Sequence, residues 1–318
     1  MTAVPSRGVA APPPPPPAAA PPSHPARRAH VAPYPPTAWD PSWEPANALV
    51  AAYLAVTLVP LVVAVALDRT SATRLGAHAT MLLLTGWGAR PRHGHSRIAA
   101  WLPWIPLLLV PALYNELPHV AAGFGTAMHD ARVLGWEHGL FGASPARTFS
   151  AAAPWRWLSE TLHAGYLSYY ALIFGPPLLL FARGRRRAFA VSAFTVMLAF
   201  VCCYAVFVCF PVQGPWFEWP VPTTIPDGPV RRAVERLLRA GSSRGTAFPS
   251  SHVAVSLAQT LAVLRASRPL GAACAVCTLA LALGAVYGSL HYGVDVVAGA
   301  GVGTAVGLLG AKLYDRIG

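Results

Sequence analysis

The stretch AFAVSAFTVMLAFVCCYAVFVCF, residues 188–210, carries no charge and is long enough to cross a lipid bilayer as one helix. A membrane-spanning helix needs about 20 apolar residues. A shorter apolar run at 75–89 either spans, re-enters or lies at the interface. Further apolar runs occur at 46–67, 98–120, 157–182, 250–266, 270–290 and 294–313. We therefore expect an all-α, polytopic membrane helical bundle with seven or eight spans.

The composition of the whole chain agrees with this expectation. Of 318 residues, 54% are hydrophobic and 11% are charged, whereas about 25% are charged in an ordinary soluble domain. This excludes a disordered protein, a coiled coil and nearly every soluble enzyme. The net charge of +12 indicates cytoplasmic loops and lipid headgroups rather than nucleic acid as the partner.

The chain divides into two parts by composition. Fifteen of its 33 prolines lie in residues 1–45, including the run Pro12–Pro17. We expect this segment to be a disordered, polyproline-II-biased tail without chemistry of its own. Residues 46–318 are expected to form the integral membrane domain.

Basic residues predict which connections face the cytoplasm. Alternation of the spans places three basic clusters on one membrane face, which the positive-inside rule makes cytoplasmic. These clusters are Arg183–Arg187, Arg265 with Arg268, and Lys312 with Arg316. The long loops 121–156 and 211–249 and the short connection 291–293 then lie on the outer face of the cell membrane.

The string Phe248-Pro249-Ser250-Ser251-His252 opens the predicted helix 250–266. Proline fixes φ and serine hydroxyls cap free amides, so these residues suit a helix start. Capping does not account for a histidine at the start of an apolar helix. Because the free amides of a helix N-terminus also bind anions, the string predicts a site that holds phosphate and supplies a proton.

A second string, His291-Tyr292-Gly293-Val294-Asp295, opens the predicted helix 294–313. The i, i+4 spacing places the histidine and the aspartate on one helical face. A neighbouring carboxylate fixes the tautomer of an imidazole and raises its basicity. An ionisable group in a membrane span marks a functional candidate, although the pair is also suited to capping a helix at the interface.

The topology places both strings at the same outer face. We expect His252, His291 and Asp295 to converge there, with one histidine attacking phosphorus and the other protonating the leaving oxygen. This chemistry needs neither a metal nor another cofactor. A metal site built from the same three side chains is one alternative, and a non-catalytic lipid-binding protein is another.

The phosphate charge needs a cation, and the 211–249 loop supplies candidates. Most of its arginines lie between Asp227 and Gly241, where helix start and stop residues and an apolar stripe predict an amphipathic helix at headgroup level. We expect those arginines to face lipid or solvent. Arg244, just before the first string, is the best candidate phosphate ligand, and Gln213 is a weaker one.

The two strings resemble signatures of the type 2 phosphatidic acid phosphatase (PAP2) superfamily. Residues 249–252 are similar to its Pro-Ser-Gly-His signature, and residues 291–299 are similar to its His-Tyr-x-x-Asp-Val-x-x-Gly signature. The firm resemblance covers residues 211–307. It implies a six-helix core, a lipid-phosphate substrate, and a phosphohistidine on His291 with Asp295 as its partner. His252 would be the general acid.

The same resemblance implies roles for the two serines and points to one branch. Ser250 matches the phosphate-binding serine, and Ser251 replaces the usual glycine. Gly284 and Ala285 stand where many members have Ser-Arg, and the 211–249 loop lacks the Lys-x6-Arg-Pro signature. The chain is more similar to the inositolphosphotransferase branch, which includes inositol phosphorylceramide synthases. The tyrosine-rich segment 166–170 resembles that branch too.

Two further patterns have structural alternatives. Glu116-x-x-His119 and Glu160-x-x-His163 resemble the carboxylate–histidine spacing of di-iron bundles, but the two further carboxylates of such a site are not evident in the spans. A four-residue repeat of glycine favours close helix packing within the bundle and also allows a homodimer. The repeat consists of Gly299, Gly303 and Gly307.

Overall fold

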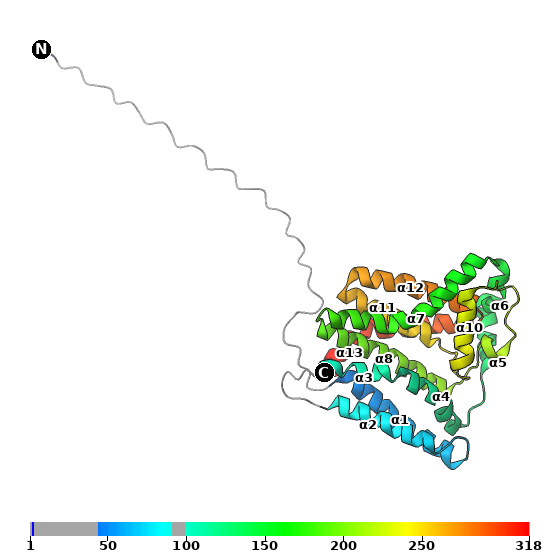
Figure 1. The fold of residues 1–318 in the computed structure, drawn as a ribbon, viewed down its shortest axis with the longest axis horizontal. Helices are drawn as coiled ribbons and strands as arrows, with labels where there is room; N and C mark the ends of the chain where they lie inside the picture. Colours follow the sequence, from blue (N-terminus) through cyan, green and yellow to red (C-terminus); the bar gives the residue numbers. More distant parts are fainter. Residues whose placement is uncertain (1, 3–43, 91–98, 318) are drawn as a thin grey trace. The chain divides into compact units, whose positions relative to one another are not determined.

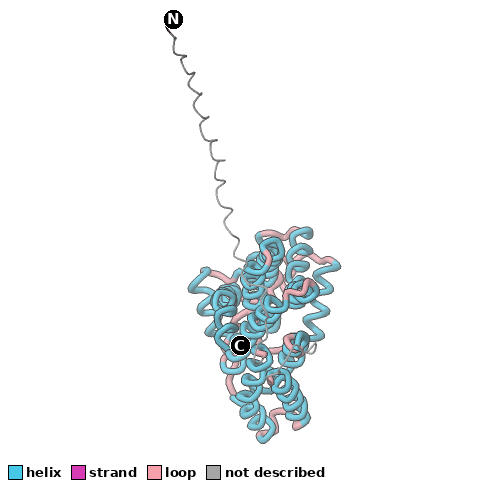
Figure 2. Tube along the Cα trace, turned by 90° about the vertical axis from the view of Figure 1, so that its left-hand side faces the viewer, coloured by secondary structure: helices cyan, strands magenta, loops and turns pink. Residues whose placement is uncertain are grey.

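The structure is a computed structural model that describes residue 2, residues 44–90 and residues 99–317 (Figure 1). In this part of the chain the structure consists of helices and loops (Figure 2). The helices are α1 (Pro45–Ala66), α2 (Thr73–Ala89), η1 (Ala99–Trp101), α3 (Trp104–Leu108), α4 (Val110–Phe124), α5 (Asp130–Phe141), α6 (Pro145–Ala152), α7 (Arg156–Ala182), α8 (Arg186–Cys209), α9 (Pro215–Glu218), α10 (Pro229–Gly241), α11 (Ser251–Ala266), α12 (Arg268–Tyr287) and α13 (Gly293–Ile317). The predicted tail, residues 1–45, lies almost entirely outside the described residues.

The long helices confirm a polytopic membrane bundle. Among the described residues, α1, α7, α8, α12 and α13 are long and apolar enough to cross a membrane. The helices α2, with 17 residues, and α11, with 16, are slightly shorter. Helix α8 is the centre of the bundle, because 72% of its most apolar stretch is buried, against 33–44% in the other four.

The apolar run 98–120, predicted as one span, is not one uninterrupted helix. It is divided into η1, α3 and α4. Pro103 is the N-cap of α3, and Pro111 lies in the first turn of α4. Because proline lacks an amide hydrogen and disfavours a helical residue before it, these positions interrupt the run. The new start at Val110 places Tyr114 one turn into α4.

The loops predicted on the outer face contain helices of their own. The segment 121–156 folds into α5 and α6. The segment 211–249 contains α10, whose bounds confirm the predicted start and stop. Its two ends pair with each other, because Val212 and Thr246 form a parallel bridge and Ala247 N–H donates to the Val212 carbonyl at 3.0 Å. The loop therefore closes on itself beside the start of α11.

The glycine repeat of α13 packs against α11. A Cβ added at Gly299 would lie 2.4 Å from the carbonyl oxygen of Ser250, and one at Gly303 would lie 2.5 Å from that of Ala254. Side chains at these positions would force the two helices apart. Packing within one chain thus accounts for these glycines, and a homodimer stays a prediction.

Candidate active site

The start of α11 places the first string at the mouth of a cavity. Ser250 is the buried N-cap, and its hydroxyl accepts the N–H of Val253 at 3.5 Å. The amides of Ser251 and His252 belong to the first turn, where backbone donors have no partner within the helix. The side chains of Ser251 and His252 line a cavity, and the positive end of the helix dipole lies at the same helix start.

The start of α13 holds the second string in a different way from the one expected. His291 lies in the turn before the helix, which begins at Gly293, rather than on a helical face. The pair still forms across the helix start, because Nδ1 of His291 lies 3.4 Å from Oδ2 of Asp295. The same oxygen accepts the N–H of Tyr292 at 2.9 Å. Asp295 is fully buried. Its carboxylate orients His291 and the backbone of this turn through these two contacts.

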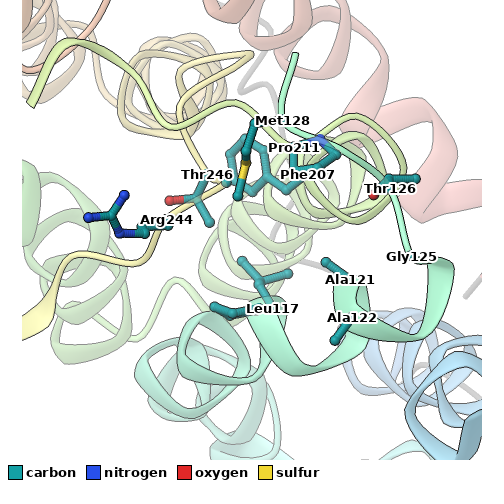
Figure 3. A pocket seen from close by; sticks show the side chains of 12 residues that line it. Leu117, Ala121, Ala122, Gly125, Thr126, Met128, Phe207, Pro211, Arg244 and Thr246 are labelled. Carbon is teal, nitrogen blue, oxygen red and sulfur yellow. The ribbon is translucent and has the colours of Figure 1, made fainter. Parts of the chain in front are cut away.

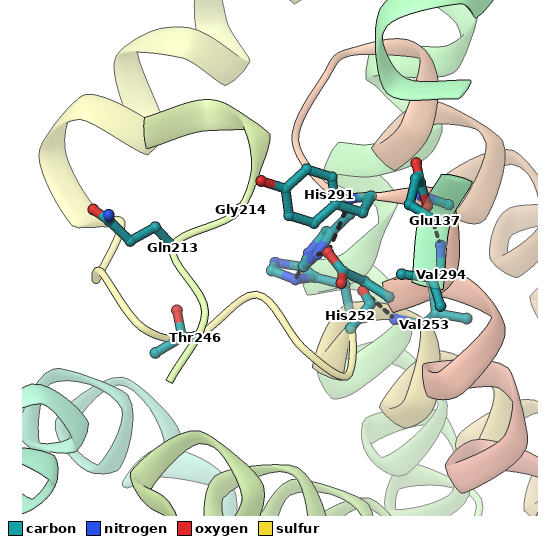
Figure 4. A network of polar contacts seen from close by, with 12 residues as sticks. Glu137, Gln213, Gly214, Thr246, His252, Val253, His291 and Val294 are labelled. Carbon is teal, nitrogen blue, oxygen red and sulfur yellow. Dashed lines mark hydrogen bonds and ion pairs between the residues drawn. The ribbon is translucent and has the colours of Figure 1, made fainter. Parts of the chain in front are cut away.

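The two strings meet at their histidines (Figure 4). Nε2 of His291 lies 3.4 Å from Nδ1 of His252. A backbone hydrogen bond also joins the strings, because Ser250 N–H donates to the Asp295 carbonyl at 3.0 Å. His252, His291 and Asp295 therefore converge as expected. They form a line of contacts in which His291 lies between the Asp295 carboxylate and His252.

Tyr166 of α7 extends this line, and sequence reasoning did not assign it a contact. Its hydroxyl lies 3.1 Å from Nε2 of His252. The rings of Tyr166 and Tyr169 lie 5.0 Å and 4.3 Å from the His252 ring. His252 is therefore held by polar contacts to Tyr166 and His291 and by two neighbouring tyrosine rings. The three-residue spacing of Tyr166 and Tyr169 places both on one helix face, and this was the sequence signal that could have indicated a shared contact.

The predicted phosphate ligands Arg244 and Gln213 contact each other. The guanidinium of Arg244 donates to Oε1 of Gln213 and lies 4.9 Å from the centre of the Phe217 ring. Gln213 lines a small cavity of about 40 Å³ together with both histidines. Gln213 therefore shares a cavity wall with the histidines, whereas Arg244 lines a different cavity and contacts Gln213.

The other arginines of the loop are engaged elsewhere. Arg231 pairs with Glu235 at 2.8 Å, Arg232 pairs with Asp227, and Arg239 lies over the Trp216 ring at 5.6 Å. Arg239 also lies 3.9 Å from the Glu235 carboxylate. These three arginines thus face carboxylates, whereas the contacts of Arg244 are with neutral groups, so its charge is better available to an anion than theirs.

A larger cavity of about 280 Å³ adjoins His252. Tyrosine rings and apolar side chains from α4, α7 and α10 form most of its wall, and Ser251 and His252 also line it. The small cavity shares Tyr114, Tyr166 and His252 with it. A third cavity, of about 200 Å³, is lined by Met128, Phe207, Arg244 and Thr246 (Figure 3) and by neither histidine. His252 therefore stands where the two adjoining cavities meet.

The di-iron-like patterns have structural roles. The Glu160 carboxylate accepts the N–H groups of Val230 and Arg231 at 2.9 and 3.1 Å and so caps α10. Glu116 forms an ion pair with His78, with Nδ1 and Oε1 2.9 Å apart. Among the described residues, no group of three or more His, Cys, Asp or Glu side chains is arranged to hold a metal ion.

Burial affects the titration of Tyr292 in the second string. Tyr292 precedes α13, and its hydroxyl donates to Oδ1 of Asp130 at 3.3 Å. Burial and, to a lesser degree, the Asp130 charge raise the pKa of Tyr292 above its ordinary value. The hydroxyl therefore stays a donor and keeps this contact at neutral pH.

The comparison with known proteins agrees with the two strings. A family model described as "PAP2 superfamily" matches residues 131–309, from α5 to α13. The match covers more than half of the chain and includes both strings. No curated protein and no solved structure matches the chain. The histidine strings, the helical bundle around them and this match together show that the chain belongs to the PAP2 superfamily.

Proposed function

We propose that this protein is a membrane-embedded lipid-phosphate phosphatase or phosphotransferase that works through a phosphohistidine on His291. The observation that carries the proposal is the line of contacts from Asp295 through His291 to His252. An imidazole with a buried carboxylate on one nitrogen presents the other nitrogen as a nucleophile. The second histidine is within reach of the same phosphoryl group.

The reaction has two steps. In the first, Nε2 of His291 forms a bond to phosphorus, and the P–O bond to the lipid breaks as His252 donates a proton to the leaving oxygen. In the second, water or an alcohol attacks the phosphohistidine, His252 takes the proton of the attacking hydroxyl, and the P–N bond breaks. Asp295 stabilises the positive imidazole in both steps.

The phosphate would lie at the start of α11. The first-turn amides of Ser251 and His252 supply donors and the positive end of a helix dipole. Ser250 supports this turn as its cap, and Gln213 with Arg244 would complete the ligands from the 211–249 loop. The linear order of His252, His291 and Asp295 favours this reaction over a metal site, in which three ligands would surround one point.

The tyrosine-lined cavity favours transfer of a phosphate-bearing head group to an alcohol, as in the inositolphosphotransferase branch. Its wall is mostly aromatic and apolar, and it ends at His252, the proposed base of the second step. An acceptor with an apolar chain would fill this cavity and exclude water from the phosphohistidine. A small hydrophilic acceptor would gain little there.

We place the site at the non-cytoplasmic face. The strings are at the starts of α11 and α13, whereas Arg265 and Arg316 are near the ends of the same helices. Arg185 donates to the Ala266 carbonyl at 2.5 Å, so two of the basic connections are neighbours. The positive-inside rule makes this basic end cytoplasmic. Labelling of single cysteines at 145 and 313 in intact cells with a membrane-impermeant reagent tests this, and we expect labelling at 145 alone.

The proposed activity is tested with purified protein and a panel of lipid phosphates, each with and without an alcohol acceptor, with products identified by mass spectrometry. We expect turnover after chelation of divalent metals, inhibition by vanadate, and a phosphorylated His291 in acid-quenched samples. Activity that requires a stoichiometric metal would support the metal site. Lipid binding without turnover across the panel would support a non-catalytic protein.

A further inference from the structure

Helix α5 carries two buried carboxylates that the proposed reaction does not use. Asp130 and Glu137 are seven residues apart, which places them on one face of the helix. Asp130 is 6% exposed and Glu137 is fully buried. A buried carboxylate is costly unless it is hydrogen-bonded, so the partners of these two groups indicate what they do.

Glu137 binds the start of α13. Its Oε2 accepts the N–H of Val294 at 2.8 Å, and its Oε1 accepts the N–H of Gly293 at 3.1 Å. The Ser144 hydroxyl donates to Oε1 at 3.0 Å. Figure 4 shows the carboxylate facing the backbone at Val294, close to His291. Glu137 thus holds the two amides that directly follow the turn containing the proposed nucleophile.

Asp130 binds the segment after α8 and the same turn before α13. Its Oδ2 accepts the N–H of Gln213 at 3.0 Å, and its Oδ1 accepts the N–H of Gly214 at 2.9 Å. Oδ1 also accepts the Tyr292 hydroxyl at 3.3 Å. One carboxylate therefore joins the backbone that carries Gln213 to the neighbour of His291.

Gln213 and His291, the site residues next to these contacts, lie on segments outside helices. Residues 210–214 follow α8, and residues 288–292 connect α12 to α13. Regular helical hydrogen bonds do not fix their backbones, yet each carries a side chain of the site. Hydrogen bonds from backbone N–H groups to a carboxylate are strong, and several on one buried group set a position closely.

We infer that Asp130 and Glu137 are positioning residues that fix His291 and Gln213 relative to each other, with α5 as the rigid spacer between them. The inference rests on the proposed function, because it assigns the two segments to one reaction. Glu137 has a second consequence. Its carboxylate accepts the first N–H groups of α13. Because these groups are then not available to an anion, we expect an anion to bind at the amides of α11.

The two carboxylates differ in the kinetic constant that they support. Glu137→Gln replaces one carboxylate oxygen with an NH₂ group. This group is a donor and faces a backbone N–H, which is also a donor, so we expect the turn that contains His291 to be displaced. We expect kcat to fall by about 10²-fold, as for a misplacement of about 1 Å, with KM little changed. Asp130→Asn displaces the backbone of Gln213, a proposed ligand of the bound phosphate. We expect it to raise KM more than it lowers kcat.

Matched variants separate positioning from general damage. Asp227→Asn removes an exposed carboxylate of the same outer region, which pairs with Arg232, and should leave both constants unchanged. Glu137→Asp keeps the charge and should recover part of the activity lost in Glu137→Ala. Melting temperature in detergent and gel filtration report folding for each variant.

Hydrogen–deuterium exchange supplies a readout that does not need activity. We expect faster exchange in peptides covering 288–296 in Glu137→Gln and Glu137→Ala, and unchanged exchange in Asp227→Asn. The inference is overturned if Glu137→Gln keeps wild-type kcat and exchange while His291→Ala is inactive. If wild type lacks turnover on every lipid phosphate, the proposed function fails, and the exchange result still decides whether Glu137 holds this turn.

Discussion

The starts of α11 and α13 are similar helix ends used in opposite ways. At α11 the cap is local, since the Ser250 hydroxyl accepts the N–H of Val253, and Ser251 and His252 in the same first turn line the cavity. At α13 the cap comes from another helix, since the Glu137 carboxylate of α5 accepts the N–H groups of Gly293 and Val294. A helix start with free donors attracts an anion, whereas one closed by a carboxylate repels it. We therefore expect phosphate at α11 and the nucleophile at α13.

The strongest test of this comparison is loss of the nucleophile at the α13 start. His291→Ala removes the nitrogen that bonds to phosphorus, and we expect kcat to fall by about 10⁴-fold or more. Radiolabelled phosphoenzyme should disappear from acid-quenched samples. Full activity in this variant would show that the nucleophile lies elsewhere.

The corresponding change at the α11 start should cost less. His252→Ala removes the proton donor, and general acids contribute about 10²- to 10⁴-fold to a rate. The loss in the first step should shrink for 4-nitrophenyl phosphate, whose leaving group needs little protonation, if His252 has this role. An equal loss for activated and unactivated esters in single-turnover reactions would contradict a general-acid role.

The contact between the two helix starts gives a test with an internal control. Gly299→Ala places a methyl group 2.4 Å from the Ser250 carbonyl oxygen, and overpacking of this kind costs about 1–3 kcal/mol. Gly301→Ala, on the same helix, meets nothing within 4 Å and should be neutral or stabilise the protein by up to about 1 kcal/mol. Unfolding in detergent and kcat are measured for both.

If Gly299→Ala is as stable and as active as Gly301→Ala, close packing of α13 on α11 does not set the distance between the histidines. We expect instead that Gly299→Ala loses activity below its melting temperature, because the two strings are pushed apart before the bundle unfolds.

The smallest expected effect is at Tyr166, which touches only the α11 side. Tyr166→Phe keeps the ring against His252 and removes the hydroxyl contact of 3.1 Å. A hydrogen bond of this kind contributes about 0.5–1.5 kcal/mol, so kcat should fall by up to about tenfold. His291 phosphorylation in the first turnover should slow in parallel. A loss as large as that of His252→Ala would make Tyr166 the proton donor itself.

Sequence reasoning succeeded where the signal was local. The bounds of α10 followed from Pro229 and Gly241, and the two strings stood out because ionisable residues are rare in the apolar runs. The break in 98–120 was also signalled locally, by Pro103 and Pro111, but the apolar composition of the run masked it.

The parts that sequence reasoning missed depend on contacts between distant residues. Asp130 binds a segment 83 residues away, and Glu137 binds one 156 residues away. Such partners leave no pattern in the neighbouring sequence, and α5 lies in a stretch predicted as loop. Two acids seven residues apart, in a chain with only twelve, were the available clue.

If the proposed function holds, the glycine repeat of α13 belongs to the reaction centre and is separate from the surface that would recognise the lipid. At the contact between α11 and α13, the glycines of α13 lie directly against the backbone of α11. A side chain at these positions has no room, so we expect few substitutions to be tolerated there. The large cavity is walled instead by α4, α7 and α10, through side chains such as Asn115, Tyr170 and Leu237. Substitutions in the wall of this cavity, in evolution or in a laboratory selection for new lipids, can therefore change its shape without changing the contact between the two histidines.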